Sequence, residues 1–180
     1  MFKGYVQVYT GNGKGKTTAA VGLAVRAAGS GLRVFFAQFI KSTGSGEFHF
    51  ISRSGTLPTL QSVDDLIEVR QYGMGFVRGA PGAEDIEAAI RGLSQCQEAV
   101  LSANYQVVIL DEINVAMTLG LLGLDEVVEL IQGRPQGVEL VLTGRGAPQR
   151  VIELADLVTE FREIKHYFTK GVTARQGIEY

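Results

Sequence analysis

A glycine-rich stretch at residues 10–18, TGNGKGKTT, has the residue types and the spacing of a phosphate-binding loop. Glycines allow consecutive backbone N–H groups to converge on an anion, and a helix that begins there adds its partial positive charge. The pattern G-x-x-x-x-G-K-[ST] fails at one position, where Thr10 stands in place of the first glycine. The alternative is an ordinary glycine-rich turn, which the GKT ending between a strand and a helix disfavours.

A bound triphosphate needs more positive charge than such a loop provides. A helix N-terminus contributes only about 0.3–2 kcal/mol per favourable charge, whereas a triphosphate carries several charges and is strongly hydrated. We therefore expect the Lys16 ammonium and a divalent cation to supply much of the compensation. By its spacing, Thr17 would offer its hydroxyl to Mg²⁺.

Two carboxylates, Asp111 and Glu112, directly follow the continuous apolar run at residues 107–110. The carboxyl ends of parallel strands lie at one edge of a sheet, so we expect these acids to face the phosphate-binding loop. Both would then serve Mg²⁺, one directly and one through water. The alternative is that they only cap the next helix.

Strand-like and helix-like segments alternate along the chain. Runs typical of strands occur at residues 5–9, 33–39, 66–70, 107–110, 138–142 and 157–164. Helical patterns occur at residues 16–28, 84–101 and about 125–132, with a short helix before the last strand. This order predicts an α/β fold with a mostly parallel, doubly wound sheet of about six strands and helices on both faces. Without a repeat or a linker, residues 1–180 are expected to form a single domain; the direction of the last strand is not predicted.

Composition excludes several classes of protein. The chain has 180 residues, of which 46% are hydrophobic, and a net charge of −2, which argues against disorder and against general electrostatic binding of nucleic acid. A single cysteine, Cys96, excludes an internal disulfide framework and a multi-cysteine metal site, and its place on an apolar helical stripe predicts a core residue. With no apolar run near the ~18 residues of a membrane span and no signal peptide, we expect no membrane association and a cytoplasmic location.

Taken together, these motifs resemble the corrinoid adenosyltransferases, the family that transfers the adenosyl group of ATP to cobalt. The matching segments are TGNGKGKTTAA at 10–20, AVRA at 24–27, QFIK at 38–41, GF at 75–76, ILDE at 109–112, LTGRGAP at 142–148, ADLVTE at 155–160, IKH at 164–166 and QGIEY at 176–180. LTGRGAP and QGIEY are the most specific of them, and Thr10 is usual in the family.

The resemblance implies a P-loop, RecA-like fold and a reaction in which Co(I), made by an external reductant, attacks C5′ of ATP and expels triphosphate. ATP would lie reversed in the loop, with its γ-phosphate where other P-loop proteins hold inner phosphates. Cobalamin, cobinamide and cobyrinic acid a,c-diamide all remain open as substrates, for synthesis or for salvage. A flavoprotein reductase or flavodoxin system would deliver the electrons, and a homodimer is expected.

The same resemblance assigns roles to individual residues. Nucleotide binding falls to Gly11, Asn12, Gly13, Lys14, Gly15, Lys16, Thr17, Thr18, Arg26 and Arg145. Mg²⁺ would be held by Thr17, Asp111 and Glu112, and the residues that act in catalysis would be Lys16, Glu112 and Phe76. A surface position for Arg145 and an ordinary core position for Phe76 are the alternatives.

One departure concerns the corrinoid. Family members studied as cobalamin enzymes carry G-F-T-W, whose Phe and Trp wedge under the ring and displace the lower ligand, whereas this chain has Phe76 followed by Val77 and Arg78. A buried Trp contributes roughly 4–6 kcal/mol at 25 cal/mol/Å², which a charged Arg78 does not match. The chain is therefore expected to use Phe76 with another apolar residue, or to prefer corrinoids without a tethered lower base.

A second departure concerns the cover of the site. Many relatives have an N-terminal extension that folds over it, and this sequence begins close to its first strand. The segment 42–55 or a second subunit is the expected cover.

Two other functions compete with adenosyl transfer. A RecA-like ATPase or a small P-loop kinase would release ADP rather than triphosphate, and a nucleotide sensor would bind ATP without consuming it. Neither accounts for LTGRGAP and QGIEY.

Overall fold

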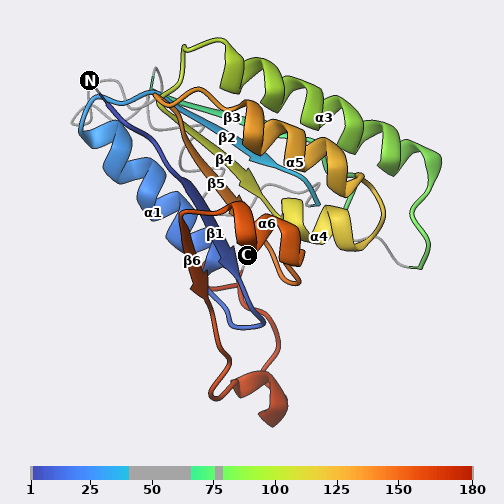
Figure 1. The fold of residues 1–180 in the computed structure, drawn as a ribbon. Coiled ribbons are helices and arrows are strands. Elements are labelled where there is room, and N and C mark those ends of the chain that lie inside the picture. Colours follow the sequence, from blue (N-terminus) through green and yellow to red (C-terminus); the bar gives the residue numbers. More distant parts are fainter. Residues whose placement is uncertain (1, 41–65, 76–78, 180) are drawn as a thin grey trace.

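The computed structural model describes residues 2–40, 66–75 and 79–179 (Figure 1). Phe76, Arg78 and the segment 42–55, which the sequence singles out for the corrinoid and for the cover, lie outside these residues. Within the described parts of the chain, no helix is both long and apolar enough to cross a membrane.

Six strands form one parallel sheet, as the alternating pattern predicts. They are β1 (Val6–Thr10), β2 (Val34–Gln38), β3 (Ile67–Gln71), β4 (Val107–Asp111), β5 (Glu139–Thr143) and β6 (Leu157–Glu160). Their order in the sheet is β3-β2-β4-β5-β1-β6, and every pairing is parallel. The last strand, whose direction the sequence leaves open, pairs parallel to β1 with Val8 opposite Val158.

Helices cover both faces of the sheet, and the three long predicted helices are confirmed to within two residues. The helices are α1 (Lys16–Gly29), α3 (Ala83–Leu101), α4 (Ile113–Thr118), α5 (Leu124–Gly133), α6 (Gln149–Leu154) and the 3₁₀ helix η2 (Tyr167–Lys170). Figure 1 shows α1 on one face, and α3 and α5 on the other. Helix α4 is not expected from the sequence, because its six residues are too few to show a helical period.

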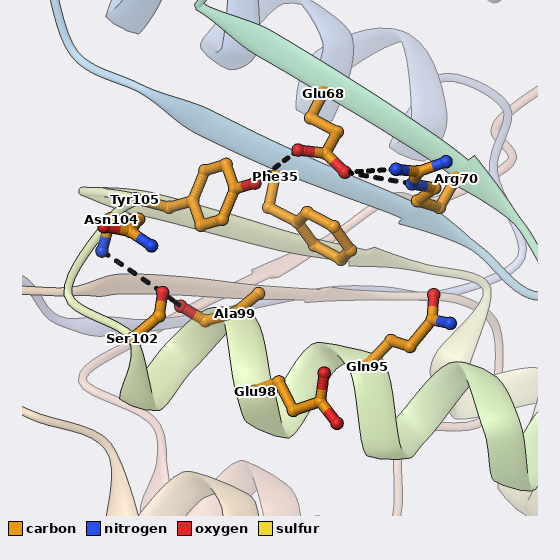
Figure 2. Close-up of a pocket in the computed structure, with 9 residues that line it drawn as sticks. All are labelled: Phe35, Glu68, Arg70, Gln95, Glu98, Ala99, Ser102, Asn104 and Tyr105. Atoms are coloured by element: carbon orange, nitrogen blue, oxygen red, sulfur yellow. Dashed lines mark hydrogen bonds and ion pairs between the residues drawn. The ribbon is translucent and has the colours of Figure 1, made fainter.

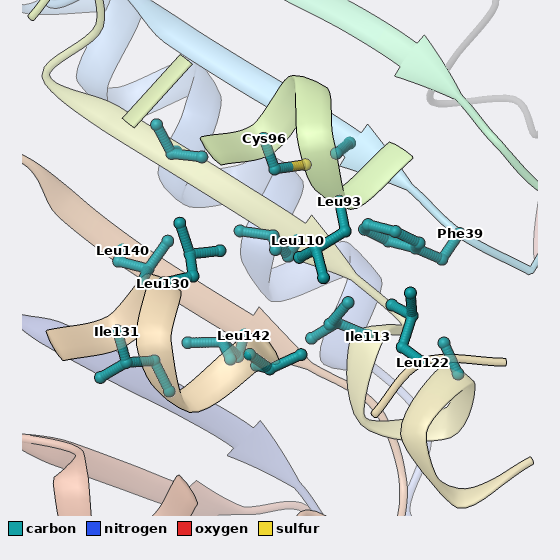
Figure 3. Close-up of a cluster of buried hydrophobic side chains, with 14 of the residues drawn as sticks. Phe39, Leu93, Cys96, Leu110, Ile113, Leu122, Leu130, Ile131, Leu140 and Leu142 are labelled. Carbon is teal, nitrogen blue, oxygen red and sulfur yellow. The ribbon is translucent and has the colours of Figure 1, made fainter. Parts of the chain in front are cut away.

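The central strands contribute side chains to two hydrophobic clusters, one on each face of the sheet. In β4, Leu110 faces the cluster under α3 and α5, and Ile109 faces the smaller cluster under α1. Figure 3 shows Leu110 among side chains of both helices, with Cys96 of α3 nearby. Cys96 is fully buried, which confirms its place in the core and raises the pKa of its thiol. Burial on both faces explains why β4 is apolar throughout.

The strand order also determines which loops meet. Because all strands are parallel, their carboxyl ends lie at one edge, and β5 stands between β1 and β4. The loop after β1, Thr143 at the end of β5 and Asp111 at the end of β4 therefore come together, with Gln38 of β2 on the far side of Asp111.

The core arrangement predicts that two apolar side chains differ sharply in their contribution to the free energy of unfolding. Leu110→Ala should lower the free energy of unfolding by about 2–5 kcal/mol, because the deletion leaves a cavity in a fully buried site. Ile90→Ala should change it by less than about 1 kcal/mol, since Ile90 of α3 is 50% exposed despite its helical spacing. Urea denaturation of both variants measures this; equal losses would contradict the placement of α3.

Candidate nucleotide-binding site

The phosphate-binding loop lines a cavity of about 260 Å³. Its lining residues are Asn12, Gly13, Lys14, Gly15, Lys16, Thr17, Thr18, Glu112, Arg145, Glu163, His166, Ile178 and Glu179. The structure thus gathers nine of the residues predicted for the site, together with a wall from the last part of the chain that the sequence analysis did not assign.

Glycines shape the loop for two physical reasons. Gly15 begins α1 in the left-handed region, with a φ of 113°, which side chains disfavour. At Gly13 the reason is close packing, because an added Cβ would lie 2.8 Å from the backbone of Phe161. The Gly13 N–H also donates to the Phe161 carbonyl at 2.7 Å. The end of β6 therefore supports the loop from behind.

Lys16 lies across this loop rather than in solvent. It is 7% exposed, and its Nζ donates to the carbonyl oxygens of Gly11 at 2.8 Å and Gly13 at 2.9 Å. Burial lowers the pKa of the ammonium, and the nearby carboxylate of Glu112 raises it in turn. Lys16 is thus a buried cation that lines the cavity. Its ammonium is held by two carbonyl oxygens that another acceptor could replace.

Thr10, the departure from the loop pattern, has a contact of its own. Its Oγ1 accepts a hydrogen bond from the Ala147 N–H at 3.2 Å. Glycine at this position has no hydroxyl. The contact ties the phosphate-binding loop to the LTGRGAP segment, which carries Arg145 into the cavity.

Asp111 is a fully buried carboxylate at the carboxyl end of β4. The Thr17 hydroxyl donates to its Oδ1 at 2.9 Å, and the Thr143 hydroxyl donates to the same oxygen at 2.7 Å. The Gln38 amide donates to Oδ2 at 3.1 Å. The structure thus brings Thr17 and Asp111 together as expected, and it adds two donors that the sequence analysis missed.

Glu112 begins α4 in a strained backbone conformation. Its φ is 63°, in the left-handed region that is uncommon for residues other than glycine. Its N–H donates to Thr143 Oγ1 at 3.0 Å, while its side chain makes no capping hydrogen bond to α4. The alternative role of this acid as a helix cap is therefore not supported. Strain of this kind is typical of functional sites, and Glu112 lines the cavity.

Arg145 and Arg26 differ in their relation to this cavity. Arg145, in the loop after β5, is exposed and lines it. Arg26 is not among the lining residues: it lies in the last turn of α1, about 15 Å along the helix axis from Lys16. Nucleotide binding by Arg26 stays a prediction.

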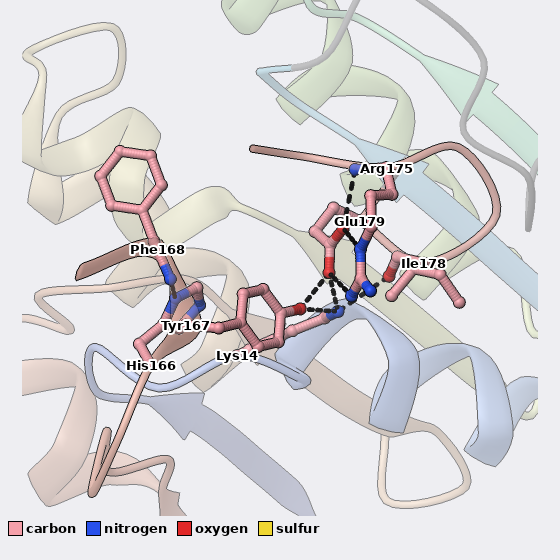
Figure 4. A network of polar contacts seen from close by, with 7 residues as sticks. All are labelled: Lys14, His166, Tyr167, Phe168, Arg175, Ile178 and Glu179. Atoms are coloured by element: carbon pink, nitrogen blue, oxygen red, sulfur yellow. Dashed lines mark hydrogen bonds and ion pairs between the residues drawn. The ribbon is translucent and has the colours of Figure 1, made fainter. Parts of the chain in front are cut away.

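A polar network joins Lys14 of the loop to the end of the chain (Figure 4). Lys14 Nζ donates to the Ile178 carbonyl at 2.8 Å and pairs with Glu179 at 2.9 Å. Glu179 also accepts from Tyr167 and from Arg175, and the Arg175 guanidinium lies over the Tyr167 ring. Hydrogen bonds to its carboxylate hold the pKa of Glu179 well below its usual range. The bond from Arg175 has the largest effect, followed by those from Tyr167 and Lys14. A carboxylate therefore occupies the cavity wall beside the loop.

A larger hollow, of about 400 Å³, lies elsewhere, between β3 and α3 (Figure 2). Its polar groups bond to one another: Glu68 accepts from Tyr105 and pairs with Arg70 at 2.8 Å. It contains none of the residues predicted for the nucleotide. Volume alone therefore does not identify the functional site.

Among the described residues, no three His, Cys, Asp or Glu side chains gather as a metal cage. The hydroxyl of Thr17 and the carboxylates of Asp111 and Glu112 are instead a partial set of hard oxygen donors. Such a set suits Mg²⁺ that is completed by water and by substrate phosphates.

Comparisons with known proteins decide the family. The family model for ATP:corrinoid adenosyltransferases BtuR/CobO/CobP matches residues 2–180. The chain belongs to this family. It is 38% identical to the corrinoid adenosyltransferase of Escherichia coli (strain K12), over 99% of this chain and 86% of that protein. It is 36% identical to the corrinoid adenosyltransferase of Pseudomonas aeruginosa, with 99% and 84% covered, and to corrinoid adenosyltransferase CobA of Salmonella typhimurium, with 99% and 86% covered.

Membership of the ATP:corrinoid adenosyltransferase family confirms the resemblance seen in the sequence. The family transfers the adenosyl group from ATP to corrinoids, so ATP and a corrinoid are its substrates. An unrelated RecA-like ATPase or small kinase is not favoured.

The Lys14–Glu179 pair of this adenosyltransferase predicts competition between a side chain and the substrate. Glu179→Gln should tighten ATP binding about two- to fivefold, the range of an exposed ion pair, because Lys14 is predicted to bind phosphate and the neutral amide would compete less for it. Calorimetric titration with ATP measures the effect.

The matched control is Glu163→Gln, a carboxylate of the same cavity for which no contact with Lys14 is described. It should leave ATP affinity nearly unchanged. Weaker ATP binding by Glu179→Gln would mean that the terminal wall builds the site instead of competing for Lys14.

Proposed function

We propose that this chain transfers the 5′-deoxyadenosyl group of ATP to Co(I) of a corrinoid and releases triphosphate. The corrinoid would be cobalamin, cobinamide or cobyrinic acid a,c-diamide, and residues 1–180 would act as one P-loop domain. The observation that carries the proposal is the cavity in which residues 12–18 converge with Glu112 and Arg145, in a chain of this family.

The loop and its cations would bind the triphosphate. Residues 15–18, at the start of α1, line the cavity, where the N–H groups of a helix N-terminus and the helix dipole would attract phosphate. Lys16 now bonds to carbonyl oxygens of Gly11 and Gly13, and phosphate oxygens would replace these acceptors within the reach of the same side chain. Lys14 and Arg145, which also line the cavity, would add further positive charge. ATP would lie reversed in the loop, which exposes C5′ to the corrinoid.

Thr17, Asp111 and Glu112 would hold Mg²⁺. The hydroxyl hydrogen of Thr17 is donated to Asp111, so the lone pairs of Thr17 Oγ1 remain for a cation. Glu112 lines the cavity and would bind directly, whereas the buried Asp111 would act through Thr17 or through water. When bound, Mg²⁺ stabilises negative charge on the departing triphosphate.

The chemical step needs no proton transfer by the protein. The cobalt electron pair forms the Co–C5′ bond as the C5′–O bond breaks, and the bonding electrons leave with the triphosphate. The tasks of the chain are therefore orientation and stabilisation of the leaving group. His166, which lines the cavity, accepts a hydrogen bond from the Phe168 N–H at its Nδ1 and is not required as a base.

Co(I) implies an external source of electrons. A flavoprotein reductase or flavodoxin system would supply them, and a homodimer of the chain would provide further cover for the corrinoid. Phe76 would contact the corrinoid from the segment that follows Gly75.

The decisive experiment is anaerobic incubation with ATP, Mg²⁺ and chemically reduced cobalamin or cobinamide. The expected products are triphosphate and a corrinoid with the absorption spectrum of a cobalt–carbon bond. Release of ADP would favour an ATPase or a kinase, and binding of ATP without consumption would favour a sensor.

Lys16→Ala is predicted to lower the turnover number at least about 100-fold, the usual loss for a group that stabilises developing negative charge. Turnover under anaerobic conditions measures it, with thermal unfolding as the check on the fold. Lys3→Ala removes an exposed cation far from the cavity and should change neither quantity. Near-normal turnover of Lys16→Ala would refute the assigned role of the loop.

Arg78 predicts a preference among corrinoids. Because Arg78 does not replace the wedge of the family Trp, turnover with cobinamide should exceed turnover with cobalamin. Arg78→Trp should raise turnover with cobalamin about tenfold, which corresponds to only ~1.4 kcal/mol of barrier, and leave cobinamide nearly unaffected. Steady-state comparison of the two substrates tests both points, and a clear preference of the unmodified chain for cobalamin would count against them.

A further inference from the structure

We propose that Gln38 is a positioning residue for the nucleotide site. Its side-chain amide holds the Asp111 carboxylate in the orientation that receives the Thr17 hydroxyl hydrogen, which keeps the Thr17 oxygen available toward the cavity. The inference rests on the proposed function, in which Thr17 contacts the Mg²⁺ that accompanies ATP.

The first support is the place of Gln38 in the sheet. In the parallel register, Gln38 of β2 stands opposite Asp111 of β4 on one side and opposite Gln71 of β3 on the other. Residues at one register position point to the same face. Thr143 of β5, one position beyond the last β4–β5 pair, extends this row of polar side chains at the carboxyl edge.

The second support is the orientation of the Gln38 amide. Its Nε2 donates to Asp111 Oδ2 at 3.1 Å, and its Oε1 accepts from Gln71 Nε2 at 2.8 Å. Gln38 is only 3% exposed. Because the Asp111 carboxylate only accepts hydrogen bonds, the Nε2 end of Gln38 must face it, and Gln71 satisfies the Oε1 end that points the other way.

The third support is the uneven supply of donors to the two oxygens of Asp111. Oδ1 receives Thr143 at 2.7 Å and Thr17 at 2.9 Å, whereas Oδ2 has Gln38 at 3.1 Å and a longer contact to Thr17 at 3.2 Å. Without Gln38, the buried Oδ2 would draw the Thr17 hydroxyl to itself, because a buried acceptor without a partner is costly. The orientation of the Thr17 lone pairs would then change.

A neutral amide is the appropriate donor here. A lysine in this position would cancel the charge of Asp111 and repel the cation that the carboxylate orients. An apolar residue would supply no donor. Gln38 therefore fixes the carboxylate and preserves its negative charge.

The test measures how Mg²⁺ changes ATP affinity in the absence of corrinoid. Gln38→Leu has nearly the same volume and no donor. Calorimetric titrations with ATP, in EDTA and over a series of Mg²⁺ concentrations, should give an Mg²⁺ affinity about 10-fold weaker, the lower end of the range for partners of metal ligands, because Gln38 acts on Thr17 through Asp111. ATP binding in EDTA should stay nearly unchanged, which a general structural defect would not allow.

The matched control is Gln7→Leu. Gln7 Nε2 also donates to a carboxylate, Glu139, in the same sheet but outside the cavity. It should lower thermal stability less, because Glu139 is partly exposed and keeps the Tyr5 N–H as a donor, and it should leave the Mg²⁺ dependence intact. If Gln38→Leu also leaves the Mg²⁺ dependence intact, the positioning role is refuted.

Two further variants keep the test decisive. If Gln38→Leu does not fold, Gln71→Leu removes the second hydrogen-bond partner that holds the Gln38 amide in place. It should weaken Mg²⁺ affinity about threefold in the same titrations, a smaller effect because Gln71 lies one residue further from the cation. An unchanged value would refute the inference. Thr17→Val separates the two levels of the proposal. If it also leaves the Mg²⁺ dependence unchanged, the proposed Mg²⁺ site fails and the inference with it; if it abolishes the dependence while Gln38→Leu does not, only the inference fails.

Discussion

Burial of the Asp111 carboxylate is the constraint on which the site depends. A charge with no exposure to water is tolerated only when hydrogen-bond donors replace its hydration. Here the strand order supplies them, because β4 lies between β2, which carries Gln38, and β5, which carries Thr143. The remaining donor, Thr17, comes from the first turn of α1. The sheet is thus coupled to the phosphate-binding loop through one carboxylate.

The loop itself is held from behind by segments far away in the sequence. Gly13 is hydrogen-bonded to Phe161 after β6, and Thr10 accepts from Ala147 after β5. Such backing fixes the N–H groups in advance, so less ordering is needed when an anion binds. It also explains a threonine at the first position of the pattern, since a glycine there could not make the contact to Ala147.

Local patterns in the sequence predicted the strands, the long helices and the pairing of the loop with Asp111, because each depends on neighbouring residues or on the common direction of parallel strands. The contacts of Gln38 and Thr143 with Asp111 were not predicted, since they arise from the register between strands. The pairing of Glu179 with Lys14 was not predicted, because the two residues lie 165 positions apart in the sequence. Within the predicted helix 84–101, the apolar side chains of Ile90 and Leu101 are exposed in the structure. Periodicity identifies a helix but does not fix how wide its buried stripe is.

The two lysines of the cavity wall already have partners that a ligand would have to displace. Lys14 is paired with Glu179, Lys16 with loop carbonyls, and both lie near further acids of the wall. A ligand with one negative charge gains little by displacing these partners. A polyphosphate that arrives with a divalent cation would satisfy the lysines and would add positive charge beside the carboxylate of Glu112. Under the proposed function, the mixture of charges would favour a metal-bound polyphosphate, and the low net charge of the chain is compatible with such a site.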